Sequence, residues 1–252
     1  NFLDYNVLAH DPHHPQHGQH IGILLIELGV GIERLQRSDK GEAQIVRTDG
    51  GTLEAECVFY SMGRIANLDG LHLENTGVER DKLGNITVNP LFQTTEPNIY
   101  AAGDVIGPPS LASPSVEQGR LAVRNAFTLK SQFFPDFLPY VIYTIPEISS
   151  IGPTEEELQE QGVHYEVGRA YYYEIARGPI AGDTSGMFKL IFHAETLELL
   201  GVHIIGTGAT ELIPLGQRAI HFHARVDYFV DNIFNYPTFA EGYRIAALNG
   251  LN

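Results

Sequence analysis

The chain has 252 residues, of which 43% are hydrophobic and 19% are charged, a composition typical of a folded globular protein with one large core or two modest ones. Its 16 Lys and Arg residues against 31 Asp and Glu residues give a formal charge of −15, which disfavours binding to nucleic acid or to anionic membranes. The sequence shows no apolar run of about 18 residues, no signal-peptide pattern and a single cysteine, Cys57, which excludes an internal disulfide. We therefore expect a soluble, cytoplasmic protein.

The first 60 residues begin with an irregular stretch and continue as strands. Residues 10–20 hold five histidines and two prolines, which favours a loop over a metal site because no paired cysteine or carboxylate stands nearby at ligand spacing. Strand-like runs follow at Ile23–Ile26, Gly31–Leu35, Ala43–Arg47 and Thr52–Tyr60. Asp49-Gly50-Gly51 predicts a hairpin between the last two runs. Cys57 lies in the final run, where we expect a buried thiol.

The middle of the chain is rich in Gly, Asn and Asp, with short strands expected at Ile86–Val88 and Asn98–Ala102. A helix is predicted after Ser113, which would cap it, with Pro114 at the first helical position. The run Phe133–Pro139 is typical of a linker and separates two lobes near residue 138.

The second lobe has a different pattern of elements. A strand-like opening at Tyr140–Ile145 precedes a helix with a capping box at Thr154-Glu-Glu-Glu157. Strands are expected near residues 163–173, 186–193 and 199–205, with helices beginning near Thr210 and Thr238.

The segment that ends in Gly103-Asp104 carries the clearest chemical signal. An acid at the end of a buried strand can accept hydrogen bonds from a sugar-like hydroxyl, and Gly103 permits close backbone approach. The helix that begins about ten residues later offers unpaired N–H groups to an anion. A carboxylate that binds a polyol chain, next to a helix N-terminus that stabilises negative charge, suits a flavin that becomes reduced. Gly-Asp alone could also simply end a strand.

Four segments in order resemble the glutathione reductase and dihydrolipoamide dehydrogenase family of pyridine nucleotide-disulfide oxidoreductases. They are Gly63-Arg-Ile-Ala-Asn67, Leu73-Glu-Asn-Thr-Gly-Val78, Gly84-Asn-Ile-Thr-Val88 and Thr95-Glu-Pro-Asn-Ile-Tyr-Ala-Ala-Gly-Asp104. The resemblance implies an FAD site in which Asp104, preceded by Gly103, holds the ribityl chain. It also implies that Leu111 and Ala112 meet the flavin pyrimidine edge through backbone groups. It further implies NAD(P) as the second cofactor.

The terminal lobe resembles the dimerisation domain of the same family, which implies a homodimer through residues 139–252. Disulfide reductases of the family carry His-Pro-Thr-x-x-Glu near their end, whereas this chain has Tyr236-Pro-Thr-Phe-Ala-Glu241. A phenol with a pKa near 10 is a poor proton shuttle at neutral pH compared with imidazole. The lobe instead resembles the transhydrogenase members of the family through Asn235-Tyr-Pro-Thr238, Gly168-Arg-Ala170 and Tyr243-Arg-Ile-Ala-Ala-Leu-Asn-Gly-Leu251. This resemblance implies hydride transfer from NADPH to NAD+ through FAD, with Tyr236 beside the partner's flavin or packed at the dimer interface.

The resemblance implies an α/β plus α+β fold with three parts: residues 1–60 from the NAD(P)-binding domain, residues 61–138 closing the FAD-binding domain, and residues 139–252 forming the dimerisation domain. No Gly-x-Gly-x-x-Gly follows a strand and the family's cysteine pair is not visible, so the chain corresponds to a C-terminal half and we assign no catalytic residue. Two alternatives stay open: a non-catalytic dimerisation module, and a lipoamide- or mercuric-type disulfide reductase.

Overall fold

The computed structural model describes residues 7–9, 25–27, 29–61, 63–130, 134–135 and 137–252. The chain forms two compact units, residues 1–86 and residues 87–252. The histidine-rich stretch at residues 10–20, for which we expected a loop, lies outside the described residues. No described helix is long and apolar enough to cross a membrane.

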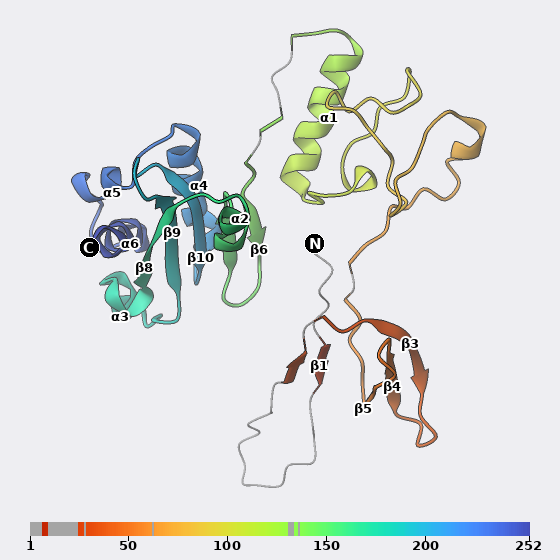
Figure 1. Cartoon of the computed structure of the whole chain (residues 1–252), viewed down its shortest axis with the longest axis horizontal. Coiled ribbons are helices and arrows are strands. Elements are labelled where there is room, and N and C mark those ends of the chain that lie inside the picture. Colours follow the sequence, from red (N-terminus) through yellow and green to blue (C-terminus); the bar gives the residue numbers. More distant parts are fainter. Residues whose placement is uncertain (1–6, 10–24, 28, 62, 131–133, 136) are drawn as a thin grey trace. The chain divides into compact units, whose positions relative to one another are not determined.

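The first unit is built from antiparallel strands (Figure 1). The strands are β1 (Val7–Ala9), β2 (Leu25–Glu27), β3 (Ile32–Arg37), β4 (Ala43–Arg47) and β5 (Thr52–Ala55). β1 pairs with β2, and β3, β4 and β5 form a second sheet in that order. β4 is central in this sheet and carries the buried pair Ile45 and Val46.

The predicted hairpin between β4 and β5 is confirmed. The side chain of Asp49 accepts a hydrogen bond from the Gly51 N–H at 2.9 Å, and the Gly50 N–H donates to the Arg47 carbonyl at 3.0 Å. Gly50 has a φ of 86°, which a residue with a side chain rarely adopts. The Asp-Gly-Gly signal therefore specified the turn correctly.

The strand expected at Thr52–Tyr60 is only partly present, because β5 ends at Ala55. The residues after it pair with no strand, so Cys57 is exposed and the expectation of a buried thiol is wrong. Phe59 and Tyr60 are exposed as well. Alternating hydrophobic residues predicted a strand here, but a strand forms only where a neighbour can complete its hydrogen bonds.

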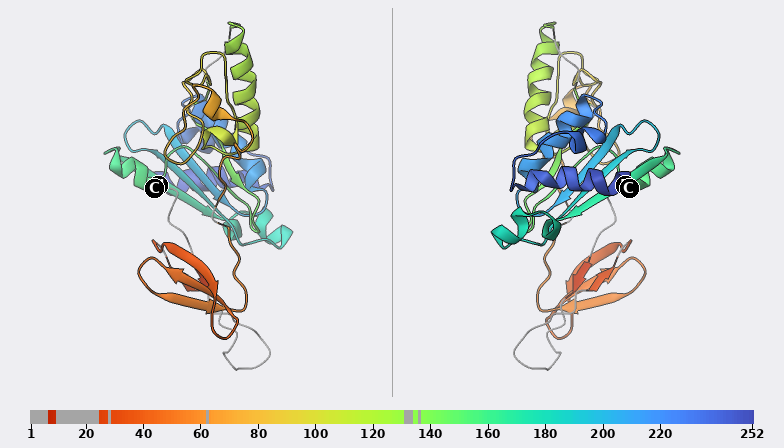
Figure 2. Two further views of the ribbon diagram at one scale, coloured as in Figure 1. Left: turned by 90° about the vertical axis from the view of Figure 1, so that its right-hand side faces the viewer. Right: turned by 90° about the vertical axis from the view of Figure 1, so that its left-hand side faces the viewer.

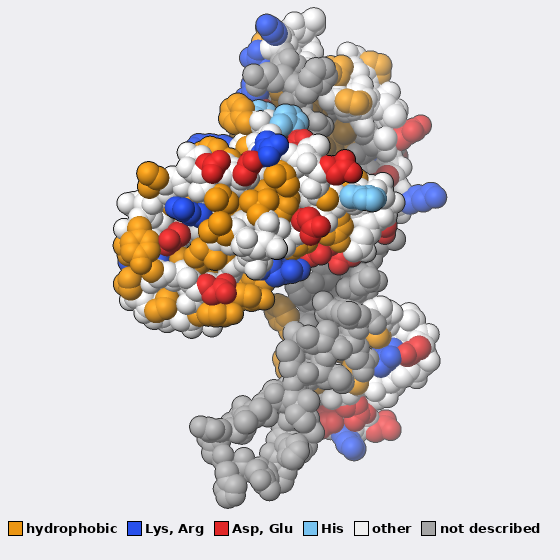
Figure 3. Space-filling view, turned by 60° about the vertical axis from the view of Figure 1, so that its left-hand side comes forward, with side chains coloured by type: hydrophobic (Ala, Val, Ile, Leu, Met, Phe, Trp, Pro, Cys, Tyr) orange, Lys and Arg blue, Asp and Glu red, His pale blue; other side chains and the backbone are white. Residues whose placement is uncertain are grey.

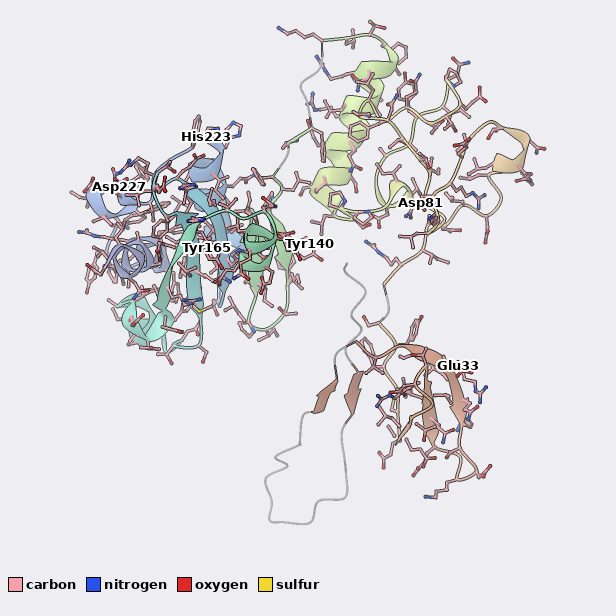
Figure 4. All side chains as sticks on the ribbon, in the orientation of Figure 1. Glu33, Asp81, Tyr140, Tyr165, His223 and Asp227 are labelled. Carbon is pink, nitrogen blue, oxygen red and sulfur yellow. The ribbon has the colours of Figure 1, made fainter. Side chains whose placement is uncertain are left out.

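Residues 56–61 and 63–103 form turns, isolated bridges and one short 3-10 helix instead of the two predicted short strands. Around Ile86–Val88 the structure has only single bridges from Arg80 to Ile86 and from Val88 to Thr94. Asn98–Ala102 contributes one bridge, from Tyr100 to Gln93. Tight turns hold these segments: Asp81, labelled in Figure 4, accepts hydrogen bonds from the backbone N–H groups of Leu83 and Asn85 at 2.8 and 2.9 Å.

The described helical elements between β5 and residue 130 are two short 3-10 helices and one long helix. They are η1 (Leu73–Asn75), η2 (Asp104–Ile106) and α1 (Ala112–Ala126). One face of α1 is buried, through Pro114, Gln118, Leu121 and Ala122. Leu121 and Ala122 form a small core with Phe92, against which Phe134 packs edge to face.

The second lobe is a five-stranded antiparallel sheet with strand order β6-β7-β10-β9-β8. Its strands are β6 (Tyr140–Ile142), β7 (Ile148–Ile151), β8 (Tyr165–Tyr171), β9 (Met187–His193) and β10 (Leu199–Ile205). The expected strands near 163–173, 186–193 and 199–205 are confirmed as β8, β9 and β10. The strand at Tyr140 is shorter than expected, and β7 was not anticipated.

Helices α4 (Ala209–His221) and α6 (Gly242–Leu251) pack on this sheet (Figures 1 and 2). The other helices of this lobe are short: α2 (Glu155–Glu160), η3 (Tyr172–Glu174), α3 (Arg177–Ala181), α5 (Asp227–Asp231) and η4 (Phe239–Glu241). The capping box of α2 is confirmed: the Thr154 Oγ1 accepts from the Glu157 N–H, and the Glu157 carboxylate accepts from the Thr154 N–H. The helices predicted near Thr210 and Thr238 are present as α4 and as η4 with α6.

The main core of the molecule lies between this sheet and helices α4 and α6. Phe188, Tyr243 and Phe229 are fully buried in it, and Tyr243 contacts both phenylalanine rings. Helix α6 lies directly on β8: a Cβ added to Gly168 would stand 2.0 Å from the Ala246 carbonyl oxygen. This close approach requires glycine at that position.

Candidate functional site

The predicted acid, Asp104, lies in a tight turn between two glycines that have positive φ. Gly103 has a φ of 81° and Gly107 a φ of 86°. The Ile106 N–H donates to the Gly103 carbonyl at 3.0 Å, and the Gly107 N–H donates to the Asp104 carbonyl at 3.1 Å. The Asp104 side chain is exposed, so the turn presents its carboxylate to the surface.

Helix α1 begins at Ala112, with Leu111 in extended conformation as its N-cap. Ser113 is therefore inside the first turn and is not the cap we predicted from sequence. No side chain caps this N-terminus, and no acidic residue stands in its first turn. The Ser115 hydroxyl instead donates to the Leu111 carbonyl at 2.7 Å. The start of α1 thus keeps the partial positive charge of an uncapped helix end.

The Gly103-Asp104 turn packs against the first two turns of α1. A Cβ added to Gly103 would stand 3.4 Å from the Ser115 Cβ, so there is room for little more than a methyl group between the turn and the helix. The Gly103 N–H also donates to the Gln118 Oε1 at 2.8 Å. The structure therefore brings together four of the predicted site residues, Gly103, Asp104, Leu111 and Ala112, at one end of α1.

Gln118 is a residue of this site that the sequence reasoning missed. It is 3% exposed, and it is the only polar member of the buried stripe of α1. A signal was present: a glutamine at a position that the helical period places among Pro114, Leu121 and Ala122 is expected to have a specific hydrogen-bond partner.

The fifth predicted residue, Tyr236, belongs to a different segment. It is 68% exposed and stands in the loop between α5 and η4. The Thr238 Oγ1 donates to the Asn235 carbonyl at 2.7 Å, and Phe239 stacks on Tyr172 with ring centroids 4.6 Å apart. These contacts attach the loop to the buried side of the lobe and leave the Tyr236 ring at the surface.

Tyr172 anchors that loop to the core. Its ring is fully buried, and its hydroxyl donates to the Thr207 carbonyl at 3.0 Å. Burial raises the pKa of Tyr172, with smaller contributions from the Asp183 and Glu147 carboxylates, so this phenol stays neutral and acts as a donor. Further along, one carboxylate oxygen of Glu241 is buried without a hydrogen-bond partner among the described residues.

Charged groups elsewhere in the second lobe are mostly engaged locally. Glu147 accepts hydrogen bonds from the Thr210 hydroxyl at 2.7 Å and from the Thr210 N–H at 3.1 Å, which lowers the pKa of Glu147. His223, labelled in Figure 4 after α4, lies 2.6 Å from a Glu198 oxygen. The face in Figure 3 shows acidic, basic and hydrophobic side chains interspersed. Among the described residues, no group of three or more His, Cys, Asp or Glu could hold a metal ion.

Two family models match the chain. A model of the pyridine nucleotide-disulphide oxidoreductase dimerisation domain matches residues 138–247. A model described as pyridine nucleotide-disulphide oxidoreductase matches residues 19–119.

Similar curated proteins carry one shared name. A soluble pyridine nucleotide transhydrogenase of Escherichia coli (strain SMS-3-5 / SECEC) is 44% identical over 230 residues, covering 87% of this chain and 48% of that protein. One of Mycobacterium bovis (strain BCG / Pasteur 1173P2) is 48% identical over 222 residues, covering 87% of this chain and 47% of that protein. The chain thus spans about half the length of these relatives.

Solved structures share the fold. LpdA from Mycobacterium tuberculosis matches with a TM-score of 0.74 and 24% identity, over 87% of this chain and 48% of that one. The HOCl-induced flavoprotein disulfide reductase RclA from Escherichia coli matches with a TM-score of 0.76 and 24% identity, over 86% of this chain and 50% of that one. The mixed α/β and α+β fold expected from the sequence is confirmed, including its terminal sheet-and-helix domain.

Proposed function

The chain belongs to the pyridine nucleotide-disulphide oxidoreductase family, whose cofactors are FAD and NAD(P), and on this basis we propose that it forms part of a flavoprotein that transfers hydride from NADPH to NAD+. The name of its relatives supports this reaction. The observation that carries the proposal is the contact between the Gly103-Asp104 turn and the start of α1. We expect the protein to be cytoplasmic, with NADPH and NAD+ as substrates.

The turn and the helix start fit one part of a flavin. Asp104 is exposed on the turn, and its carboxylate can accept hydrogen bonds from the hydroxyls of a ribityl chain. Leu111 and Ala112 are the N-cap and the first residue of α1, where no side chain caps the helix and the backbone N–H groups have no partner within the helix. The two features lie side by side because the Gly103 N–H donates to the Gln118 side chain of α1.

When bound, FAD supplies the two-electron chemistry of the reaction. The chain's own contribution is binding and electrostatics. The start of α1 favours negative charge by about 0.3–1 kcal/mol when exposed, and by up to about 2 kcal/mol when partly buried. Because about 1.4 kcal/mol corresponds to about 30 mV for a two-electron couple, this helix would raise the flavin potential modestly.

The second half of the proposal concerns the dimerisation domain. Residues 139–252 would join two copies, residues 61–138 would close the FAD-binding domain, and residues 1–60 would belong to the NAD(P)-binding domain. The match of the dimerisation-domain model supports the homodimer. Tyr236 is exposed on a loop next to Phe239, which stacks on the buried Tyr172 ring. Tyr236 would contact the flavin of the partner subunit or lie at the dimer interface.

The nature of residue 236 favours transhydrogenation over disulfide reduction. A disulfide reductase needs a group that exchanges protons near neutral pH beside its thiols, and imidazole suits that task better than a phenol. The only cysteine of this chain, Cys57, cannot form a dithiol pair within it. Steady-state kinetics of the protein that contains this chain, with NADPH and NAD+ both varied, should be ping-pong; efficient disulfide reduction without transhydrogenation would refute the proposal.

The role of Asp104 can be tested directly by flavin binding. Asp104→Ala should weaken FAD binding by about tenfold to a hundredfold, because hydrogen bonds to a charged group contribute about 1.5–3 kcal/mol. Asp81→Ala is the matched control, since Asp81 closes a surface turn in the other unit. Equal FAD affinity of Asp104→Ala and the unaltered protein, measured by fluorescence titration, would contradict the assignment.

A second candidate is a dimerisation module without activity of its own, which the match over residues 138–247 favours. Flavin absorbance and the molecular mass in solution distinguish the two candidates. A purified chain that is dimeric by light scattering and shows no flavin absorbance would support the module. Bound flavin would support the oxidoreductase.

A further inference from the structure

Two backbone hydrogen bonds close the Gly103-Asp104 turn, from the Ile106 N–H and the Gly107 N–H, but both lie within the turn and do not fix its place on α1. Gly103 and Gly107 flank the single turn of η2, and glycine has more backbone freedom than any other residue. Asp104 between them is exposed, so where its carboxylate lies depends on how the whole turn is placed. A carboxylate binds a ligand more tightly when its position is set before the ligand arrives, because less conformational entropy is then lost on binding.

Gln118 supplies a fixed point. It lies on α1, fifteen residues after Gly103, and its Oε1 accepts the Gly103 N–H at 2.8 Å. Because a backbone N–H can only donate, the amide orientation with the oxygen toward Gly103 is the one that satisfies it. This bond attaches the residue immediately before Asp104 to the second turn of the helix whose N-terminus forms the other half of the site.

The surroundings of Gln118 are apolar, so packing alone does not explain a polar side chain at this position. Its neighbours on the buried stripe are Pro114, Leu121 and Ala122, so an apolar side chain would suit the same position. A polar group buried without a partner destabilises a fold, and Gln118 avoids this through its bond to Gly103.

We propose that Gln118 is the positioning residue of the flavin site, holding the Gly103-Asp104 turn against α1 so that the Asp104 carboxylate and the helix N-terminus keep a fixed separation. This inference rests on the proposed function, because it concerns the same site. Gln118 acts through Gly103 and does not itself contact the ligand. Its loss should therefore loosen the turn first and weaken flavin binding as a consequence.

The first test measures amide hydrogen exchange by NMR in the unliganded chain. In Gln118→Met, which keeps the length of the side chain but removes the acceptor, the Gly103 N–H should exchange about tenfold faster relative to the Ala101 N–H. Ala101 is the internal reference, since its N–H donates to the Phe92 carbonyl at 3.0 Å. Gln118→Glu keeps an acceptor and should restore the slow exchange.

Leu121→Ala is the matched control for general loosening of this region. Leu121 is buried on the same stripe one turn later, and it has no bond to the turn. Its truncation should raise both exchange rates and leave the ratio of Gly103 to Ala101 unchanged. An unchanged ratio in Gln118→Met, or an equal rise in Leu121→Ala, would overturn the inference.

The second test is FAD affinity by fluorescence titration. Gln118→Met should raise the dissociation constant about tenfold, and Gln118→Glu should return it to within about threefold of the unaltered protein. A loosened turn with unchanged affinity would overturn the positioning role. Failure of the unaltered protein to bind FAD would instead refute the proposed flavin site, and the exchange ratio would then decide alone whether Gln118 fixes the turn.

Discussion

The two parts of the second unit are held together in different ways. Residues 140–252, here called the sheet domain, enclose a continuous core of buried aliphatic and aromatic residues between the sheet and helices α4 and α6. Residues 87–130, here called the α1 segment, have a core of only three buried residues, Phe92, Leu121 and Ala122. The sheet domain can therefore specify its own structure, whereas the α1 segment depends more on turns and single hydrogen bonds.

The difference matters because the proposed flavin site lies in the less strongly packed part. Regions with few buried contacts open locally at lower free energy than a core does. The site residues Gly103 and Asp104 are held by backbone bonds within their turn and by Gln118. A ligand that binds this turn would stabilise the α1 segment by an amount that rises with the logarithm of the ligand concentration over its dissociation constant, and the sheet domain much less.

The largest expected effect comes from the centre of the sheet domain. Tyr243→Ala should lower the free energy of unfolding by about 3–5 kcal/mol, because the ring is fully buried against Phe188 and Phe229. Urea denaturation followed by circular dichroism measures it. Tyr243→Phe, the control, should cost about 1–3 kcal/mol, since the Gly216 N–H and the Leu212 carbonyl lose their partner. A loss below about 1 kcal/mol in Tyr243→Ala would contradict the central role of this core.

Truncation in the small core should have a smaller and more local effect. Phe92→Ala should cost about 2 kcal/mol, less than a similar change in a large core, because Phe92 has few buried neighbours. Hydrogen exchange should quicken across the α1 segment and stay unchanged in β8, β9 and β10. Equal quickening in the sheet domain would show that the two parts unfold as one.

The same contrast explains what could be predicted from the sequence. In the sheet domain, β8, β9, β10 and α4 follow hydrophobic patterns that match their packing, and the Thr154 capping box is local and complete. In residues 56–103 the hydrophobic runs predicted strands that have no partner to pair with, so turns and single bridges replace them. Pairing partners are a property of the fold and cannot be seen in a short run.

The candidate site was predictable in part for related reasons. Gly103-Asp104 was found because glycine and an acid at the end of an apolar run signal a turn that presents a carboxylate. The helix start was placed two residues too late, because Ser113 and Pro114 form a strong capping signal that the chain does not use. Gln118 was missed because its meaning depends on a contact fifteen residues away.

A moderate effect is expected at the start of α2. Thr154→Ala should cost about 1 kcal/mol, since it removes the acceptor for the Glu157 N–H. Thr154→Ser is the control and should stay within about 0.5 kcal/mol of the unaltered protein, because serine is an equally good N-cap. Equal stability of Thr154→Ala and Thr154→Ser in urea denaturation would contradict the contribution of this box.

The smallest effect is a dependence of stability on pH at His203 in β10. Desolvation lowers the pKa of His203 from 6.5, and the nearby Lys189 ammonium lowers it further. The Pro153 carbonyl, 3.3 Å from the ring, and the carboxylates of Glu155 and Glu156 oppose this shift. His203 is therefore neutral in the folded protein at neutral pH.

The direction of the effect follows from proton binding in the two states. Below pH 6.5 the unfolded chain binds a proton at this histidine more readily than the folded chain does, so stability falls as the pH decreases towards the folded-state pKa. His203→Gln keeps a donor for the Pro153 carbonyl and has no titrating group, so it should lose less stability between pH 7 and pH 5. Denaturation curves at these two pH values measure the difference, and parallel losses in both proteins would show that His203 titrates normally. Because the sheet domain rather than the α1 segment contains this group, the loss should appear in its transition and leave the exchange of the Gly103 N–H unchanged.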